Sequence, residues 1–86
     1  MSAIEDIVTG IEAVIEDAAQ ISATAAEVLK QTEEGLTQVE ERGATAAIEG
    51  LTQVKEQLEA LTGLIDSVSS VAEEAHTAAK AVAFDR

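Results

Sequence analysis

The sequence predicts an all-α protein, a hairpin of two long antiparallel helices that self-associates into a four-helix bundle. Proline is absent from the 86 residues, and alanine, glutamate and leucine, which favour helices, are frequent. Apolar residues recur with a seven-residue period, and a break containing glycine falls near the midpoint. A chain of this length forms one domain, which we assign to residues 1–86.

The first helix is predicted over about residues 2–42. Ser2 and Glu5 match a capping box, in which the serine oxygen accepts a backbone N–H at the start of a helix. Apolar residues then follow three adjacent tracks: Ile4, Ile11, Ala18, Ala25 and Val39; Ile7, Val14, Ile21 and Val28; Val8, Ile15, Leu29 and Leu36. Because a two-stranded coiled coil needs only two tracks, we expect more than one neighbouring helix.

A tight turn is predicted at residues 42–45. Arg42 suits a helix C-terminus, Gly43 suits the left-handed residue that follows it, and Thr45 suits an N-cap. The alternative is one unbroken helix, which would follow a path of small and apolar residues: Leu36, Val39, Gly43, Ala47 and Leu51. We favour the hairpin, because so long a helix without a regular heptad would be unusual.

The second helix is predicted over about residues 45–84, with two apolar tracks. They are Ala44, Leu51, Leu58, Ile65, Ala72 and Ala79; and Ala47, Val54, Leu61, Val68, Ala75 and Val82. From both helices we predict one set of core and oligomer-interface residues: Ile7, Ile11, Val14, Ile21, Val28, Leu51, Leu58, Leu61, Ile65 and Val68.

Residues 34–41 return as residues 49–56 with seven of eight positions identical, one copy on each side of the predicted turn. The repeat is either a surface element presented by both helices or a slippage duplication that a helical chain tolerates. We favour the duplication. Gly35 lies on the core stripe, so it is the glycine we expect at a close helix crossing.

The residues of this chain offer little chemistry. It has one histidine and no cysteine, tryptophan or tyrosine, so nucleophile–base pairs are nearly unavailable and we expect no enzyme activity. Glu73 and His76 have the spacing of a di-iron bundle, but the apolar tracks of the first helix hold no carboxylates to complete such a site. We therefore expect no metal and place His76 at the edge of the core. Few large side chains are present to line a pocket, so no cofactor or small-molecule ligand is expected.

The net charge of −12 comes from 17 acidic and five basic residues. It repels phosphate backbones, which argues against nucleic-acid binding. No uncharged run approaches the length of a transmembrane segment, and no signal peptide opens the chain. We expect a cytoplasmic protein.

Two helices of about 40 residues, a glycine-containing turn near the midpoint, where Glu41-Arg42-Gly43 stands, and an acidic, alanine-rich composition resemble the small WXG-type hairpin proteins of type VII secretion. The resemblance covers the whole chain as architecture. The family's turn carries Trp-x-Gly, of which this chain keeps the glycine. The family's C-terminal Tyr with an acid four residues later is replaced by adjacent Phe84 and Asp85. The resemblance implies a homodimeric or heterodimeric four-helix bundle that serves as a partner or adaptor and is exported by a non-classical route.

We therefore expect a non-catalytic interaction module. Its partner would be itself, as a dimer or tetramer, or a paralogous helical-hairpin protein. The alternative is an amphipathic protein that coats granules or lipid surfaces and resembles phasins. Interfacial helices usually carry bulky aromatic residues flanked by Lys or Arg, which are scarce here.

Overall fold

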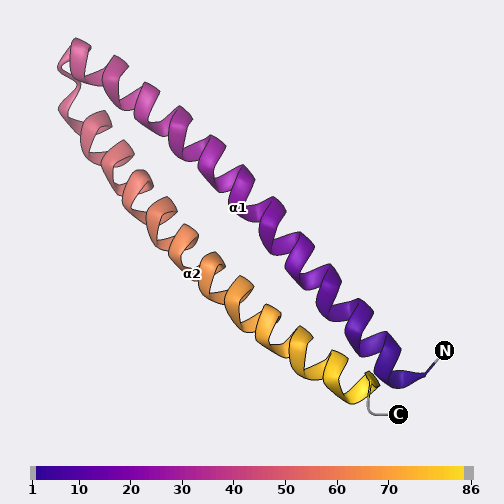
Figure 1. Cartoon of the computed structure of the whole chain (residues 1–86). Helices are drawn as coiled ribbons and strands as arrows, with labels where there is room; N and C mark the ends of the chain where they lie inside the picture. Colours follow the sequence, from indigo (N-terminus) through magenta and orange to yellow (C-terminus); the bar gives the residue numbers. More distant parts are fainter. Residues whose placement is uncertain (1, 85–86) are drawn as a thin grey trace.

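The computed structural model describes residues 2–84 and places them in two antiparallel helices of equal length (Figure 1). Helix α1 spans Ala3–Arg42 and helix α2 spans Thr45–Phe84, 40 residues each. The start of α1 and the end of α2 lie at the same end of the hairpin and the turn lies at the other (Figure 1). The prediction of an all-α chain with two long helices is confirmed, and the single unbroken helix does not form. Asp85, paired above with Phe84, lies outside the described residues.

Both ends of α1 are closed by local hydrogen bonds. Ser2 is the N-cap, and its Oγ accepts a hydrogen bond from the Glu5 backbone N–H at 3.2 Å. After Arg42, Gly43 adopts a left-handed conformation with φ of 68°. The Gly43 N–H donates to the Glu40 carbonyl and the Ala44 N–H donates to the Val39 carbonyl, both at 3.1 Å. This is a Schellman motif, which satisfies carbonyls that the helix end leaves free.

Helix α2 begins directly after this motif. The Ala44 carbonyl accepts the first helical hydrogen bond, from the Ile48 N–H at 3.0 Å, so Ala44 occupies the N-cap position. Thr45 is therefore the first residue of α2 rather than its cap. The turn is one residue shorter than predicted. Ala44 completes the Schellman motif with its N–H and also serves as the N-cap of α2 with its carbonyl, so Thr45 already lies inside the helix.

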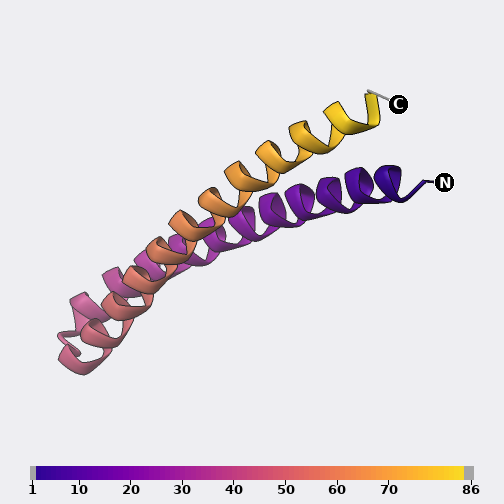
Figure 2. The same ribbon diagram turned by 90° about the horizontal axis from the view of Figure 1, so that it is seen from below.

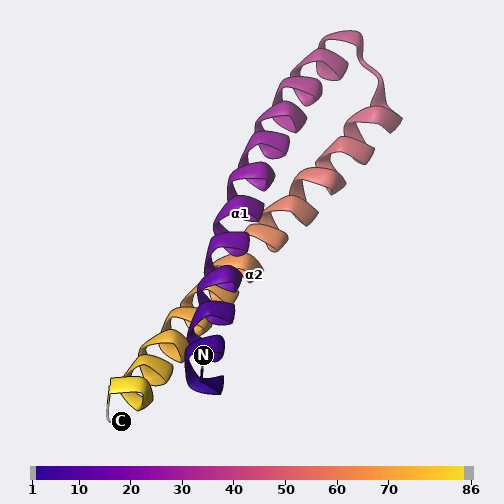
Figure 3. The same ribbon diagram turned by 90° about the vertical axis from the view of Figure 1, so that its right-hand side faces the viewer.

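The contact between the helices follows one continuous heptad pattern. Apart from Gly35, which is also half-buried, the half-buried and buried residues of each helix recur alternately three and four positions apart, and we term this set the seam. The seam comprises Ile4, Val8, Ile11, Ile15, Ala18, Ser22, Ala25, Leu29, Thr32, Leu36 and Val39 of α1, and Ile48, Leu51, Lys55, Leu58, Thr62, Ile65, Ser69, Ala72, His76, Ala79 and Ala83 of α2. The spacing is that of a two-stranded coiled coil. Figures 2 and 3 accordingly show the two helices winding around each other.

Small side chains dominate the most buried part of the seam. Among the described residues, only Ala18, Ala25, Thr32 and Ala72 are buried, with 3% to 8% of their surface exposed. No large side chain of residues 2–84 is fully buried. Small residues let helix backbones approach closely, but they remove little apolar area from water. The hairpin by itself therefore has a thin core.

Two polar contacts across the seam show how the helices are aligned. Lys55 Nζ lies 3.5 Å from Glu33 Oε2, and His76 Nε2 lies 3.0 Å from Glu12 Oε2. This alignment places Leu36 opposite Leu51, the third residue of each copy of the internal repeat. The two copies therefore pack partly against each other beside the turn.

Candidate protein interface

One side of the hairpin exposes a long row of large aliphatic side chains, which we term the apolar face. Between 37% and 65% of the surface of each residue is exposed to solvent. The apolar face comprises Ile7, Val14, Ile21 and Val28 of α1, and Val54, Leu61, Leu64, Val68, Val71 and Val82 of α2. These side chains are larger than the alanines that the seam buries.

Two shallow grooves show that both helices contribute to this face. One groove, of about 510 Å³, is lined by Ile21 and Val28 of α1 together with Leu61 of α2, and Asp17 also lines it. The other, of about 620 Å³, has Val14 of α1 facing a row of α2 residues that includes Leu64, Val68 and Val71. The apolar face is therefore one surface that runs along the seam and is built from two helices.

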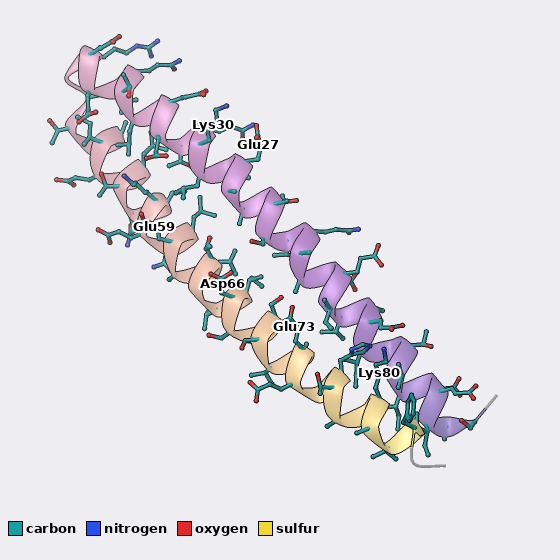
Figure 4. All side chains as sticks on the ribbon, in the orientation of Figure 1. Glu27, Lys30, Glu59, Asp66, Glu73 and Lys80 are labelled. Carbon is teal, nitrogen blue, oxygen red and sulfur yellow. The ribbon has the colours of Figure 1, made fainter. Side chains whose placement is uncertain are left out.

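The positions that flank the seam on its other side are mostly acidic, and we term them the acidic face. Figure 4 labels four of these positions on α2, which follow one another at heptad spacing. The acidic face comprises Glu5, Glu12, Glu33 and Glu40 of α1, and Glu59, Asp66, Glu73 and Lys80 of α2. Lys55 and His76 extend from the seam toward it, since their partners Glu33 and Glu12 belong to it. The hairpin thus has one apolar and one acidic side.

The residues predicted as core and interface fall on two different surfaces. Ile11, Leu51, Leu58 and Ile65 lie in the seam and are half-buried. The others lie on the apolar face and are exposed: Ile7, Val14, Ile21, Val28, Leu61 and Val68. The prediction placed both groups in a single core because the seam track and the apolar-face track lie next to each other on each helix. The prediction did not include Leu64 and Val71, each 65% exposed on the apolar face, and both stand three residues after an apolar position that it had identified.

Several polar side chains of the hairpin make contacts within it. The hydroxyls of Thr62 and Ser67 donate to the Leu58 and Gly63 carbonyls of their own helix at 2.9 and 3.2 Å. His76 contacts Glu12 of the opposite helix. Within residues 2–84, no three His, Asp or Glu side chains gather closely enough to hold a metal ion. The residues at the turn, Arg42 and Thr45, end α1 and begin α2.

Neither helix contains, in its described part, a stretch long and apolar enough to cross a lipid bilayer. In comparisons with known proteins, the chain matches no family model, no curated protein and no solved structure. The fold and its surfaces define the chain as a coiled-coil hairpin with one apolar and one acidic side. We therefore infer its function from those two sides.

Proposed function

We propose that this chain is a non-catalytic helical interaction module that self-associates into a four-helix bundle. The observation that carries the proposal is the contrast between its two apolar surfaces. Among the described residues, the only buried seam positions are Ala18, Ala25, Thr32 and Ala72, whereas ten large aliphatic residues remain exposed on the apolar face. Exposed apolar surface that is continuous over several residues is typical of a protein contact. Two hairpins that pack face to face would bury both rows.

The total exposed surface supports the same proposal. The hairpin exposes 6061 Å². A compact monomer of 8.9 kDa is expected to expose about 4,800 Å², so the surplus is about 1,200 Å². A standard protein interface removes about 800 Å² from each partner. The surplus is thus large enough to supply a stable interface.

The charge distribution is compatible with face-to-face packing in spite of the net charge of −12. Among the ten residues of the apolar face none is ionisable, and Asp17 is the one ionisable residue that lines either of the two grooves. Packing through this face would leave the carboxylates of the acidic face in water. Exposed carboxylates far apart repel one another weakly at physiological salt, where the Debye length is about 8 Å.

The test is the mass of the purified chain in solution, measured by light scattering during size-exclusion chromatography at several protein concentrations. We expect a dimer or tetramer whose circular dichroism is strongly helical. A compact, helical monomer at all concentrations up to the micromolar range would contradict the proposal. A partly unfolded monomer that becomes helical only with a related hairpin would shift the partner from a second copy to a paralogue, as the resemblance to WXG-type proteins implies.

The apolar face also favours a second candidate, an amphipathic coat on a granule or lipid surface. Its side chains are all aliphatic and lie on one side, as in an interfacial helix, but the flanking Lys, Arg and aromatic residues of such helices are scarce here. The measurement that separates the two is circular dichroism with neutral vesicles or oil droplets. A coat protein would gain helicity or bind the droplets, whereas a bundle already closed in buffer would do neither.

A further inference from the structure

Helix α2 carries a second heptad stripe outside the seam, which we term the outer stripe. Its residues alternate three and four positions apart, as the seam residues do. They are Leu61, Leu64, Val68, Val71, Ala75, Ala78 and Val82. All seven are exposed. A stripe with this spacing fits the side of another α-helix.

The outer stripe belongs to α2 alone. In α1 the apolar track of Ile7 and Val14 is bordered on its outer side by small or polar residues, namely Gly10, Asp17 and Thr24. In α2 the equivalent border carries Leu64 and Val71, each 65% exposed, the highest value among the exposed aliphatic residues of the apolar face. The apolar face is therefore widest over α2, where a partner helix would gain the most contact area.

We propose that the outer stripe pairs with the outer stripe of a second copy, so that α2 packs against α2 and Leu64 and Val71 are its anchoring side chains. This inference rests on the proposed self-association and specifies which helix makes the contact. The stabilisation gained by burying an apolar side chain scales with the apolar area removed from water. Leu64 and Val71 expose the largest fraction of their surface on the apolar face, so they have the most to gain from such a contact.

The charges around the outer stripe favour a second copy over other partners. On the side away from the seam, the stripe is flanked by Ala60, Ser67, Glu74 and Ala81. Glu74 is the one ionisable residue among the stripe and these flanking positions. A basic protein would be attracted by carboxylates, and these lie mainly elsewhere on the hairpin. A lipid surface would call for flanking Lys, Arg or aromatic residues. A second acidic chain can approach this surface without bringing many carboxylates together.

The first experiment compares the dimer dissociation constants of Leu64→Gln, Val71→Gln and Phe84→Gln with that of the unmodified chain by analytical ultracentrifugation. Glutamine is a good helix former, so each hairpin should retain its helicity. We expect dissociation constants at least about tenfold higher for the first two variants, since each loses an apolar anchor. Phe84 is 93% exposed but lies outside the outer stripe, so its variant should match the unmodified chain.

The second experiment uses cross-linking and does not depend on weakening the dimer. The chain contains no cysteine, so a single introduced cysteine can form only an intermolecular disulfide. Leu64→Cys, Val68→Cys and Val71→Cys would be oxidised alone and in mixed pairs, with Glu59→Cys on the acidic face as the control. We expect a covalent dimer from at least one combination on the stripe and much less from the control.

The two inferences fail in different ways. If the unmodified chain is a dimer, but the glutamine variants dimerise normally and no combination on the stripe cross-links, the α2 contact is wrong and self-association stands. If the unmodified chain is a helical monomer throughout, both are wrong.

Discussion

His76 Nε2 lies 3.0 Å from Glu12 Oε2 and joins the two helices near the open end of the hairpin. His76 occupies a seam position, where its side chain is 22% exposed, while the Glu12 side chain is 55% exposed. Lys55 reaches Glu33 in the same way nearer the turn. Lys55 and His76 therefore belong to the α2 seam, but the polar ends of both side chains reach the acidic face. Such contacts align the helices but contribute little stability, because water screens them.

Replacing His76 with leucine should stabilise the hairpin. A leucine at this half-buried seam position would add apolar contact, and we expect a gain of about 1 kcal/mol in the free energy of unfolding by urea. Glu12→Gln serves as the control, since loss of an exposed polar contact should change stability by less than about 0.5 kcal/mol. A less stable His76→Leu variant would mean that the contact with Glu12 outweighs apolar burial.

Leu58 and Leu61 should respond differently to truncation, although they are neighbours on α2. Leu58 lies in the seam, so Leu58→Ala should lower the free energy of unfolding by about 2 kcal/mol. Leu61 is 38% exposed on the apolar face, so Leu61→Ala should weaken association more than it weakens the hairpin. Urea unfolding and light scattering on both variants separate the two effects. Equal losses in both measurements would indicate that the seam and the apolar face form a single core.

The left-handed conformation of Gly43 makes it sensitive to substitution. An added Cβ meets no atom within 4 Å, so the penalty of Gly43→Ala comes from the backbone at φ of 68°. We expect a loss of about 1 kcal/mol. Gly43→Asn should lose less, because asparagine tolerates this conformation. Thermal unfolding followed by circular dichroism measures both, and an unchanged Gly43→Ala variant would show that the turn can adopt another conformation.

Glycines inside the helices should behave in the opposite way. A Cβ added at Gly63 would meet nothing within 4 Å, and Gly63→Ala should raise the free energy of unfolding by about 0.5 to 1 kcal/mol. A Cβ at Gly35 would lie 3.5 Å from Leu51 Cδ1, an ordinary contact, so Gly35→Ala should also be stabilising. The melting temperature would show both gains. A loss at Gly35 alone would indicate that this crossing does require glycine.

Local signals were sufficient to locate the helix ends. Ser2 caps α1 through a side-chain oxygen, and Gly43 ends it in a left-handed conformation, as the residue types suggested. The N-cap of α2 was predicted one residue too late, at Thr45 instead of Ala44. A residue type that suits a cap does not reveal how many residues the preceding turn contains. The seam was harder to predict. One of its α2 tracks contains Lys55, Thr62 and His76, and no hydrophobic pattern reveals polar residues that reach past the core.

The sequence by itself determined that this chain is helical, that it turns near its middle and that its charge is strongly negative. Only the tertiary structure decided which apolar tracks face the other helix. Tracks on one helix lie so close together that hydrophobicity cannot rank them. The helices pack along the tracks that contain Ile11, Ala18 and Leu58, and the most buried positions of these tracks are alanines and Thr32. Small side chains at those positions let the backbones approach closely. Other large residues, such as Ile21 and Leu64, lie on the adjacent tracks and remain exposed.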